Sequence, residues 1–133
     1  DELYTIGADG ENMVRLTQDK RSDWFPNWSS NADRIVFCSE RFGGQELMLM
    51  NAAATIKTRI TIYEKGYEEA PVWSLDDKGV AYSGRPEGDE DYDIFLTSIN
   101  GFNLDEVENP VARPINLTDD DDRDDKSPSW RNY

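Results

Sequence analysis

The strongest constraint on the fold of this 133-residue chain is a Pro-x-Trp motif that occurs three times. Trp28 and Trp73 are 45 residues apart, and Trp73 and Trp130 are 57 residues apart. A motif that recurs at a similar spacing is typical of repeat proteins, in which each unit packs against its neighbours. We therefore expect the motif residues to have a structural role, with the tryptophans packing between neighbouring units; they are Pro26, Trp28, Pro71, Trp73, Pro128 and Trp130.

Two further landmarks recur in step with the motif. An acidic residue followed by apolar residues begins the stretches "ELYT", "ELML" and "DIFL", at Glu2, Glu46 and Asp93. Each stretch is followed by a short apolar-Thr element, "RLT", "RIT" or "NLT". The third copy holds ten extra residues between these landmarks, which we assign to an insertion near residues 103–114. An insertion of this kind lengthens a surface loop without disturbing the core.

The apolar runs predict β-strands. They are short, often alternate with polar residues, are rich in Val, Ile, Phe, Tyr and Trp, and are bounded by turn residues. No window sustains a helical apolar stripe, so we expect little helix. One unit predicts four strands, "PVWS", "GVAYS", "YDIFLTS" and "PINLT". Four antiparallel strands with a period of about 40–50 residues describe a propeller blade, so the predicted fold is all-β, a β-propeller of four-stranded antiparallel blades.

The predicted blades divide the chain at the Pro-x-Trp motifs. Residues 1–25 hold the last strands of one blade, residues 26–70 and 71–127 form one blade each, and residues 128–133 begin a further blade. This gives eleven strands in about three blades, whereas closed propellers have about four to eight blades. We therefore expect a part of a larger propeller, or a homodimer that completes a six-bladed ring. The prolines are expected at the beginning of a strand, because they lack an N–H.

The charge of the chain restricts its partners. Asp and Glu number 28 against 14 Lys and Arg, which gives a net charge of −14. Nucleic acid and anionic membranes are therefore excluded as favourable partners, whereas basic proteins and cations fit. No apolar run reaches the roughly 20 residues of a membrane helix, and the first residues do not resemble a signal peptide. The single cysteine, Cys38, lies in an apolar run and is expected to be a buried hydrophobic residue.

The composition argues against catalysis by this chain. There is no histidine, so a Ser-His-Asp or Cys-His site cannot form within it. The run "DDDDRDD" suggests a weak calcium site at Asp119, Asp121 and Asp122, because Ca²⁺ binds clustered carboxylates. The run does not match an EF-hand, and a solvated loop is the favoured interpretation. We expect no other cofactor.

Arginines and aromatic residues are candidates for the rims of the propeller. Arg41 and Arg85 follow the second strand at nearly equivalent positions, and they either hold a ligand carboxylate or pair with Glu46 and Asp93. The ion pairs are the simpler expectation. A carbohydrate-binding or lyase propeller would need exposed aromatic residues on one rim, and the candidates, which packing explains equally well, are Phe42, Tyr67, Tyr92 and Phe102.

The order of these elements resembles the WD-repeat-like blades of TolB-like β-propellers. The shared pattern is Pro-x-Trp-Ser, a tight turn, an apolar strand, an acid followed by apolar residues, and Leu-Thr, and it covers nearly the whole chain. The family turn reads Ser-Pro-Asp-Gly after the tryptophan, whereas this chain has "SSNA" and "SLDD". The length of the turn is kept while its sequence differs.

The resemblance implies a function that the residues alone do not. A TolB-like propeller implies a non-catalytic scaffold that binds proteins, in the periplasm or outside the cell. The alternative is the regulatory propeller of a prolyl oligopeptidase-like or tricorn-like peptidase, whose catalytic domain would lie outside this chain. A nucleophile-elbow motif in an adjoining domain would distinguish the two.

Overall fold

Ten β-strands form three antiparallel sheets in the computed structural model, which describes residues 1–61, 66–104, 113–119 and 124–131. The first sheet, here the half-blade, has two strands, β1 (Tyr4–Thr5) and β2 (Val14–Arg15). Blade I contains β3 (Asp23–Trp28), β4 (Arg34–Ser39), β5 (Glu46–Asn51) and β6 (Lys57–Arg59). Blade II contains β7 (Tyr67–Trp73), β8 (Gly79–Arg85), β9 (Asp93–Ser98) and β10 (Ile115–Asn116).

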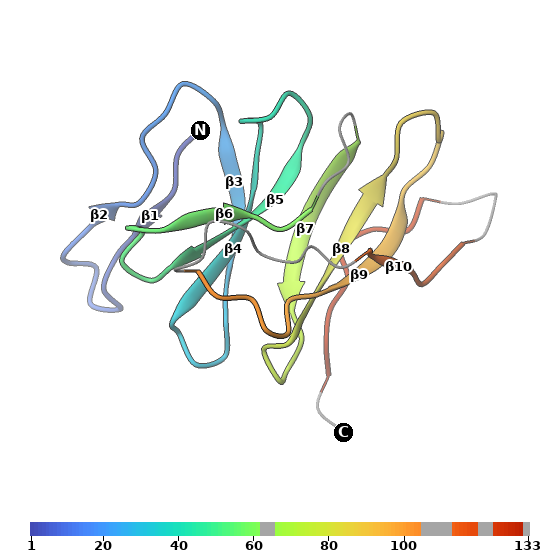
Figure 1. Cartoon of the computed structure of the whole chain (residues 1–133). Helices are drawn as coiled ribbons and strands as arrows, with labels where there is room; N and C mark the ends of the chain where they lie inside the picture. The colour runs from blue at the N-terminus through green and yellow to red at the C-terminus, as the bar shows by residue number, and fades with distance from the viewer. Residues whose placement is uncertain (62–65, 105–112, 120–123, 132–133) are drawn as a thin grey trace.

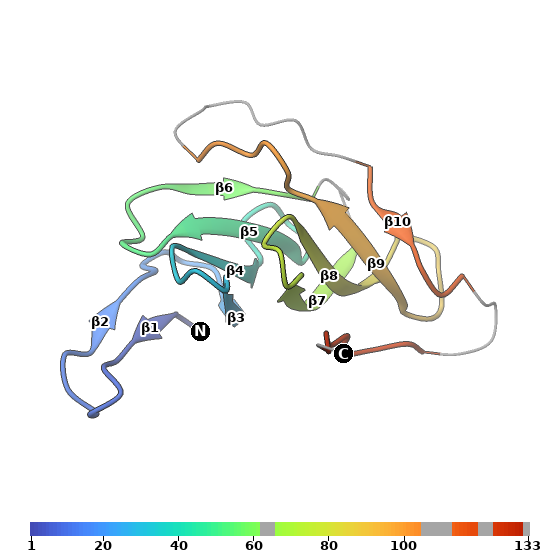
Figure 2. The same ribbon diagram turned by 90° about the horizontal axis from the view of Figure 1, so that it is seen from below.

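The strands follow one another across each sheet, so each blade is an up-and-down meander. Blade I has the order β3-β4-β5-β6, and blade II repeats it as β7-β8-β9-β10. Figure 1 shows the three sheets one after another along the chain, and Figure 2 shows them fanned around the region where both chain ends lie, with β3 and β7 on the inside. The predicted all-β propeller with four-stranded antiparallel blades is confirmed.

A tight turn of the same shape joins the first two strands of both blades. Ser29 Oγ accepts a hydrogen bond from Arg34 N at 3.0 Å, and Ser74 Oγ accepts one from Gly79 N at 2.9 Å. Ala32 and Asp77 adopt positive φ values of 57° and 54° in these turns. These two residues occupy the position of the glycine in the Ser-Pro-Asp-Gly turn of TolB-like repeats. The turn therefore keeps its geometry without the residue that favours positive φ.

Pro26 and Pro71 lie inside the first strands β3 and β7 and not at their beginning, which corrects our expectation for these two prolines. The pairing of β3 with β4 shifts between Trp24 and Asn27, around Pro26, and that of β7 with β8 shifts around Pro71. The residues before the prolines, Phe25 and Ala70, both have a φ of 51°. A β-bulge leaves one residue unpaired, so a proline is tolerated there without losing a ladder hydrogen bond.

Two apolar clusters fill the junctions between the sheets. Alternate residues of β4 point to opposite sides, as the period of a strand requires. Ile35 and Phe37 pack toward the half-blade, and Val36 and Cys38 pack toward blade II. Blade I is therefore buried on both faces, and the expectation that Cys38 is buried is confirmed, since its side chain is fully inaccessible.

The tryptophans of the motif differ in their burial. Trp73 is 5% exposed and packs between blades I and II as predicted, whereas Trp28 is 44% exposed. The prediction was wrong for Trp28 because the half-blade supplies two strands only, and these cover β4 and β5 instead of the outer face of β3.

The strand predicted at Trp130 is not formed. Residues 124–131 carry no strand, so the described part of the chain has ten strands and not eleven. A first strand needs an antiparallel second strand beside it, and no described segment occupies that place. Among the described residues, no helical segment has the length and hydropathy needed to cross a bilayer.

Candidate functional site

The loops that connect β2 to β3, β4 to β5 and β8 to β9 lie on one side of the molecule, here called the upper rim, at the top of Figure 1. A backbone hydrogen bond joins each of three segments to the sheet that precedes it at this rim; the segments are β3, β7 and residues 124–131. The donor is an acid near the start of the segment, and the acceptor is the residue before the repeated acid of the preceding sheet. The three bonds are Asp23 N to Asp1 O at 3.0 Å, Glu68 N to Gln45 O at 3.0 Å and Asp125 N to Tyr92 O at 2.7 Å.

The repeated threonine elements explain the landmarks of the sequence. In each copy the threonine hydroxyl accepts a hydrogen bond from the backbone N–H that follows the repeated acid. The pairs are Leu3 N with Thr17 Oγ1 at 2.9 Å, Leu47 N with Thr61 Oγ1 at 3.0 Å and Ile94 N with Thr118 Oγ1 at 2.9 Å. The third and fourth strands of every unit are thus joined at the upper rim.

The first residue of each threonine element reaches the acid of its own unit. Arg15 Nη2 lies 2.8 Å from Glu2 Oε1, Arg59 Nη2 lies 3.8 Å from Glu46 Oε1, and Asn116 Nδ2 donates to Asp93 Oδ2 at 2.7 Å. The acid and the threonine element therefore recur together because they form one hydrogen-bonded cluster.

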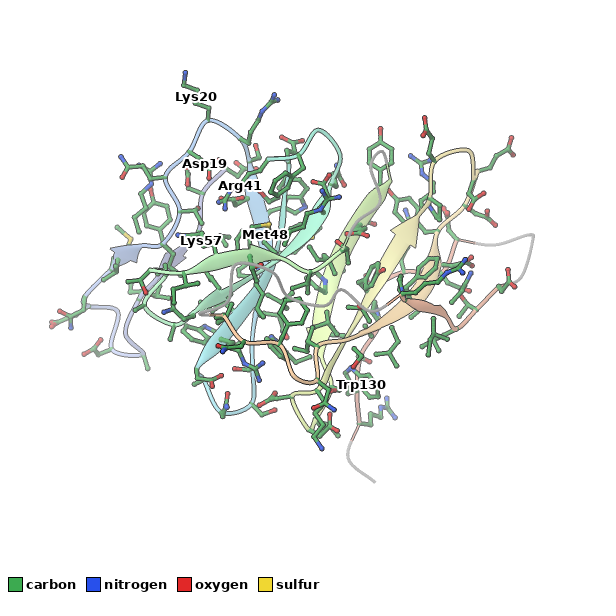
Figure 3. The ribbon with its side chains drawn as sticks, in the orientation of Figure 1. Asp19, Lys20, Arg41, Met48, Lys57 and Trp130 are labelled. Atoms are coloured by element: carbon green, nitrogen blue, oxygen red, sulfur yellow. The ribbon has the colours of Figure 1, made fainter. Side chains whose placement is uncertain are left out.

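An ion-pair cluster at the first junction buries a carboxylate. Arg41 Nη2 lies 2.7 Å from Asp23 Oδ2 and 2.6 Å from Asp19 Oδ2, and Asp23 is 1% exposed. Figure 3 shows Arg41 beside Asp19 at the upper rim, with Lys57 below them. Burial, reinforced by the charge of Arg41, lowers the pKa of Lys57. The expected pair of Arg41 with Glu46 was wrong, because Glu46 faces Arg59 instead.

The equivalent acid at the second junction is Glu68. It is buried and is held by hydrogen bonds, whereas Asp23 pairs with Arg41. Glu68 Oε2 accepts hydrogen bonds from Leu47 N at 3.0 Å and from Thr61 Oγ1. Burial is the main cause that raises the pKa of Glu68 to about 7, against the opposing hydrogen bonds. Glu68 is therefore partly protonated near neutral pH, which spares the fold the cost of an unpaired buried charge.

Exposed and half-buried aromatic and basic side chains stack on the upper rim and are here called the aromatic–basic cluster. Arg85 lies over the rings of Tyr67 at 4.7 Å and Tyr92 at 5.1 Å, and Lys126 Nζ lies 3.9 Å from the centre of Tyr92. On the same rim, Arg59 lies 4.9 Å over Phe42. The members are Phe42, Arg59, Tyr67, Arg85, Tyr92 and Lys126.

Side chains of the cluster are partly exposed to solvent but have limited conformational freedom. Phe42 is 50% exposed and Tyr67 is 42% exposed. Cation–π stacking holds the arginines against the rings, so little side-chain entropy is left to lose on binding. Tyr and Arg are also the residues enriched at the energetic centres of protein interfaces. The arrangement suits a protein-binding surface better than a catalytic site.

A cleft of about 390 Å³ adjoins the cluster on the upper rim. Its lining includes Arg21, Glu40, Gln45 and Tyr67, together with glycine backbone. Gly44 approaches Gly66 so closely that an added Cβ would lie 2.9 Å from the Gly66 carbonyl oxygen. The backbones of Gly44 and Gly66 therefore approach each other closely where they line this cleft.

Of the four aromatic candidates from the sequence, the structure brings three to the upper rim. Phe42, Tyr67 and Tyr92 belong to the aromatic–basic cluster, whereas Phe102 packs against the core at the opposite side. Arg85 stacks on two of these rings, while Asp93, its expected partner, accepts hydrogen bonds from Asn116 and Thr118.

Sequence reasoning missed Arg59, Lys126 and Glu68 as members of the rim. The recurrence of "RLT" and "RIT" was a signal for Arg59, because a cation that recurs in two copies together with a repeated acid indicates an ion pair. Lys126 carries no such signal, since it reaches Tyr92 only through the packing of residues 124–131 on blade II.

The calcium prediction stays a prediction. Asp119 is exposed and its N–H donates to Asn116 Oδ1 at 3.2 Å, while Asp121 and Asp122 lie outside the described residues. In the described ranges no group of three or more His, Cys, Asp or Glu residues is placed to hold a metal ion.

Comparison with known proteins supports the family resemblance. The chain is 30% identical over 101 residues to the Tol-Pal system protein TolB of Desulfosudis oleivorans, a match that covers 75% of this chain and 22% of that protein. No protein-family model matches the chain.

Two solved structures show the same fold. TolB from Acinetobacter baumannii superposes with a TM-score of 0.73 at 20% identity, over 92% of this chain and 28% of that chain. The putative TolB from Agrobacterium tumefaciens gives a TM-score of 0.66 at 22% identity, over 77% of this chain and 39% of that one. This chain thus spans well under half the length of the proteins that it resembles.

Proposed function

We propose that this chain, whose sequence and fold are those of TolB-like β-propeller blades, is a non-catalytic scaffold that binds a partner protein through its upper rim. The observation that carries the proposal is the partly exposed aromatic–basic cluster beside a cleft that shares Tyr67 with it. The similarity to a Tol-Pal system protein supports a role in protein assembly, and it supports a periplasmic or extracellular location.

The charge around the cluster suggests the chemistry of the partner. Exposed acids of the loop between β8 and β9, among them Glu87, Asp89 and Glu90, flank the stack. Lys126 Nζ lies 3.8 Å from Glu69 Oε1 and 4.0 Å from Asp124 Oδ2, so nearby carboxylates partly offset its charge. With a net charge of −14 for the chain, the surface favours a basic polypeptide with aromatic or aliphatic side chains that contact the tyrosines.

Peptide selection on the whole chain tests this proposal. A phage library of 12-residue peptides is selected on the wild-type chain, and the affinity of the selected peptides is measured by calorimetry. We expect peptides rich in Lys and Arg, whose affinity falls about tenfold in the Tyr67→Ala/Arg85→Ala variant, as for loss of an interface centre.

A tyrosine outside the rim provides the matched control. Tyr4 is 50% exposed and belongs to the half-blade, so Tyr4→Ala is expected to leave the affinity unchanged. Selection of no binding peptide, or of peptides that lose equal affinity in both variants, would refute a binding site at the upper rim.

A further inference from the structure

Glu68 belongs to a short stretch of parallel backbone pairing between the blades, here called the parallel edge. Residues 66–68 at the start of blade II run parallel to residues 45–47 of blade I. Gln45 N donates to Gly66 O at 3.2 Å, and Glu68 N donates to Gln45 O at 3.0 Å. Gln45 and Gly66 also line the cleft of the upper rim. The parallel edge therefore connects Glu68 to the proposed binding site through two hydrogen bonds.

The side chain of Glu68 holds the parallel edge from the inside. Its Oε2 accepts hydrogen bonds from Leu47 N at 3.0 Å and from Thr61 Oγ1, and the residue is 1% exposed. The other oxygen, Oε1, accepts no hydrogen bond from the described residues. A proton on Oε1 leaves both hydrogen bonds of Oε2 in place, whereas a carboxylate would be buried with one oxygen unpaired. The closed edge is therefore more stable when Glu68 is protonated.

The elements packed around this carboxyl group contribute charges of both signs. The titratable or charged residues around it are Cys38 of β4, Glu46 of β5, Arg59 of β6, Tyr67 and Glu69 of β7, and Arg85 of β8. Glu46 opposes a charge on Glu68, and Arg59, which favours one, lies 3.8 Å from Glu46. Burial raises the pKa of the Cys38 thiol, so this group stays neutral near pH 7. Burial is also the main cause that raises the pKa of Glu68 to about 7.

The parallel edge positions the aromatic–basic cluster as well as the cleft. Tyr67 lies within the edge, and Arg85 pairs with it across β7 and β8 and stacks over its ring at 4.7 Å. Tyr67, Glu68 and Arg85 line one small hollow between the blades. Opening of the edge would separate Tyr67 from the Gln45 side of the cleft. The closed edge is therefore the conformation that presents the cluster beside the cleft.

We propose that Glu68 regulates binding at the upper rim according to pH. When Glu68 carries a proton, the parallel edge stays closed and presents Tyr67 beside the cleft. When the proton leaves, the buried charge favours entry of water, the edge opens and the partner binds more weakly. This inference rests on the proposed function and adds its regulation.

The size of the effect follows from the fraction of the chain that is able to bind. If only the protonated form binds, the apparent Kd equals the intrinsic Kd divided by the protonated fraction. With a pKa of about 7 for Glu68, this fraction is about nine tenths at pH 6 and about one tenth at pH 8. The affinity is therefore expected to fall about tenfold between these pH values.

The direction of the change separates this regulation from a simple charge effect. A chain that becomes more negative attracts a basic peptide more strongly, so loss of a proton alone strengthens binding. Opening of the parallel edge weakens binding instead. The sequence contains no histidine, the side chain that most often titrates near neutral pH. A fall in affinity from pH 6 to pH 8 therefore indicates that the edge opens.

Calorimetry with the full chain at pH 6 and pH 8 tests the inference. The probe is the tightest-binding histidine-free peptide from the selection described above, carried out at pH 6, with its N-terminus acetylated. Wild type is expected to bind it about tenfold more weakly at pH 8. Glu68→Gln cannot lose a proton and should bind equally at both pH values, with the wild-type affinity of pH 6. Asp23→Asn changes the equivalent acid of the first junction and should keep the tenfold fall; circular dichroism verifies that both variants are folded.

Hydrogen exchange of the peptide-free chain gives a readout that needs no partner. The protection factors of the Leu47 and Glu68 amides, corrected for the faster intrinsic exchange at higher pH, are expected to fall at pH 8 in wild type. They should stay constant in Glu68→Gln. The amide of Asp23, which makes the equivalent hydrogen bond at the first junction, is the control and should keep its protection.

Three results would overturn the regulation by Glu68. They are equal affinity of wild type at pH 6 and pH 8, a tenfold fall that persists in Glu68→Gln, and protection factors that do not change with pH. Failure of the proposed function looks different, because no peptide then binds at either pH while the exchange of the two amides still depends on Glu68.

Discussion

At the junction of the half-blade with blade I the buried acid is Asp23, which pairs with Arg41, whereas at the junction of blade I with blade II it is Glu68, which hydrogen-bonds to Thr61 and Leu47. Both acids use their own backbone N–H to join the preceding sheet at the same distance of 3.0 Å. The backbone hydrogen bond is therefore the same at the two junctions, while the groups that stabilise the buried carboxyl group differ. Asp23 is paired with the cation Arg41, whereas Glu68 takes up a proton more readily because its pKa is raised.

The tryptophans give a second contrast between the junctions. Trp73 Nε1 donates to Asn27 O at 3.0 Å, and Arg34 lies 4.7 Å over its ring, so blade I supplies both contacts. Trp28 has the same motif but lies 44% exposed on the outside of its sheet. The motif thus defines where the tryptophan lies on its own strand, and only a complete neighbouring blade buries it.

The largest effect is expected from Trp73→Ala, which should lower the free energy of unfolding by about 3–5 kcal/mol through loss of burial and a cavity between the blades. Trp28→Ala, the matched control, should cost about 1 kcal/mol because much of that side chain stays in contact with water. Urea unfolding of both variants measures the difference. Equal losses would mean that the second junction contributes no more stability than the exposed face.

Arg41→Met comes next, because it leaves Asp23 buried without its cation. We expect a loss of about 3 kcal/mol, typical of breaking one side of a buried pair. Adding Asp23→Asn to this variant should restore part of the loss, since the buried charge is then removed as well. A double variant that is no more stable than Arg41→Met would show that Arg41 stabilises the junction by packing on Phe37, over which it lies at 5.6 Å.

The repeat predicted the blades because each landmark has a local physical cause. Acid, threonine element and Pro-x-Trp motif form hydrogen bonds or bulges within one unit or between neighbours, so they recur wherever the unit recurs. The class of the fold and the four-stranded blade were predictable from the sequence for the same reason.

The contacts of the candidate site could not be predicted in this way. Arg41 has an acid nearby in sequence at Glu46, but the structure turns it toward Asp19 and Asp23 from the preceding loop and strand. Arg85 and Lys126 meet at Tyr92 only because residues 124–131 return to blade II. Several acids and aromatic rings have the same chemistry, and tertiary packing decides which of them an arginine or lysine contacts. A periodic sequence pattern does not describe that packing.

The pH dependence of stability distinguishes the two junctions by charge. The folded chain keeps a proton on Glu68 up to its pKa of about 7, while the unfolded chain releases it near 4.5. The folded state therefore binds more protons between these values, and stability should fall as pH rises through this window, by on the order of 2–3 kcal/mol.

Glu68→Gln removes this titration and should flatten the change in stability between about pH 4.5 and pH 7. Asp23→Asn is the control at the first junction and should leave the fall in place. Urea unfolding at several pH values gives both profiles. An unchanged slope in Glu68→Gln would assign the dependence to other carboxylates.

The smallest effect concerns the bulge that both junctions share. Ala70 has a φ of 51°, a conformation that costs an L-residue about 1–2 kcal/mol and glycine little. Ala70→Gly should therefore stabilise the chain, but by no more than about 1 kcal/mol, because glycine gives the unfolded chain more freedom. Ala53→Gly, in a turn with ordinary φ, should destabilise it instead. If urea unfolding gives the same sign for both, the bulge carries no strain, and proline alone would account for its recurrence at every first strand.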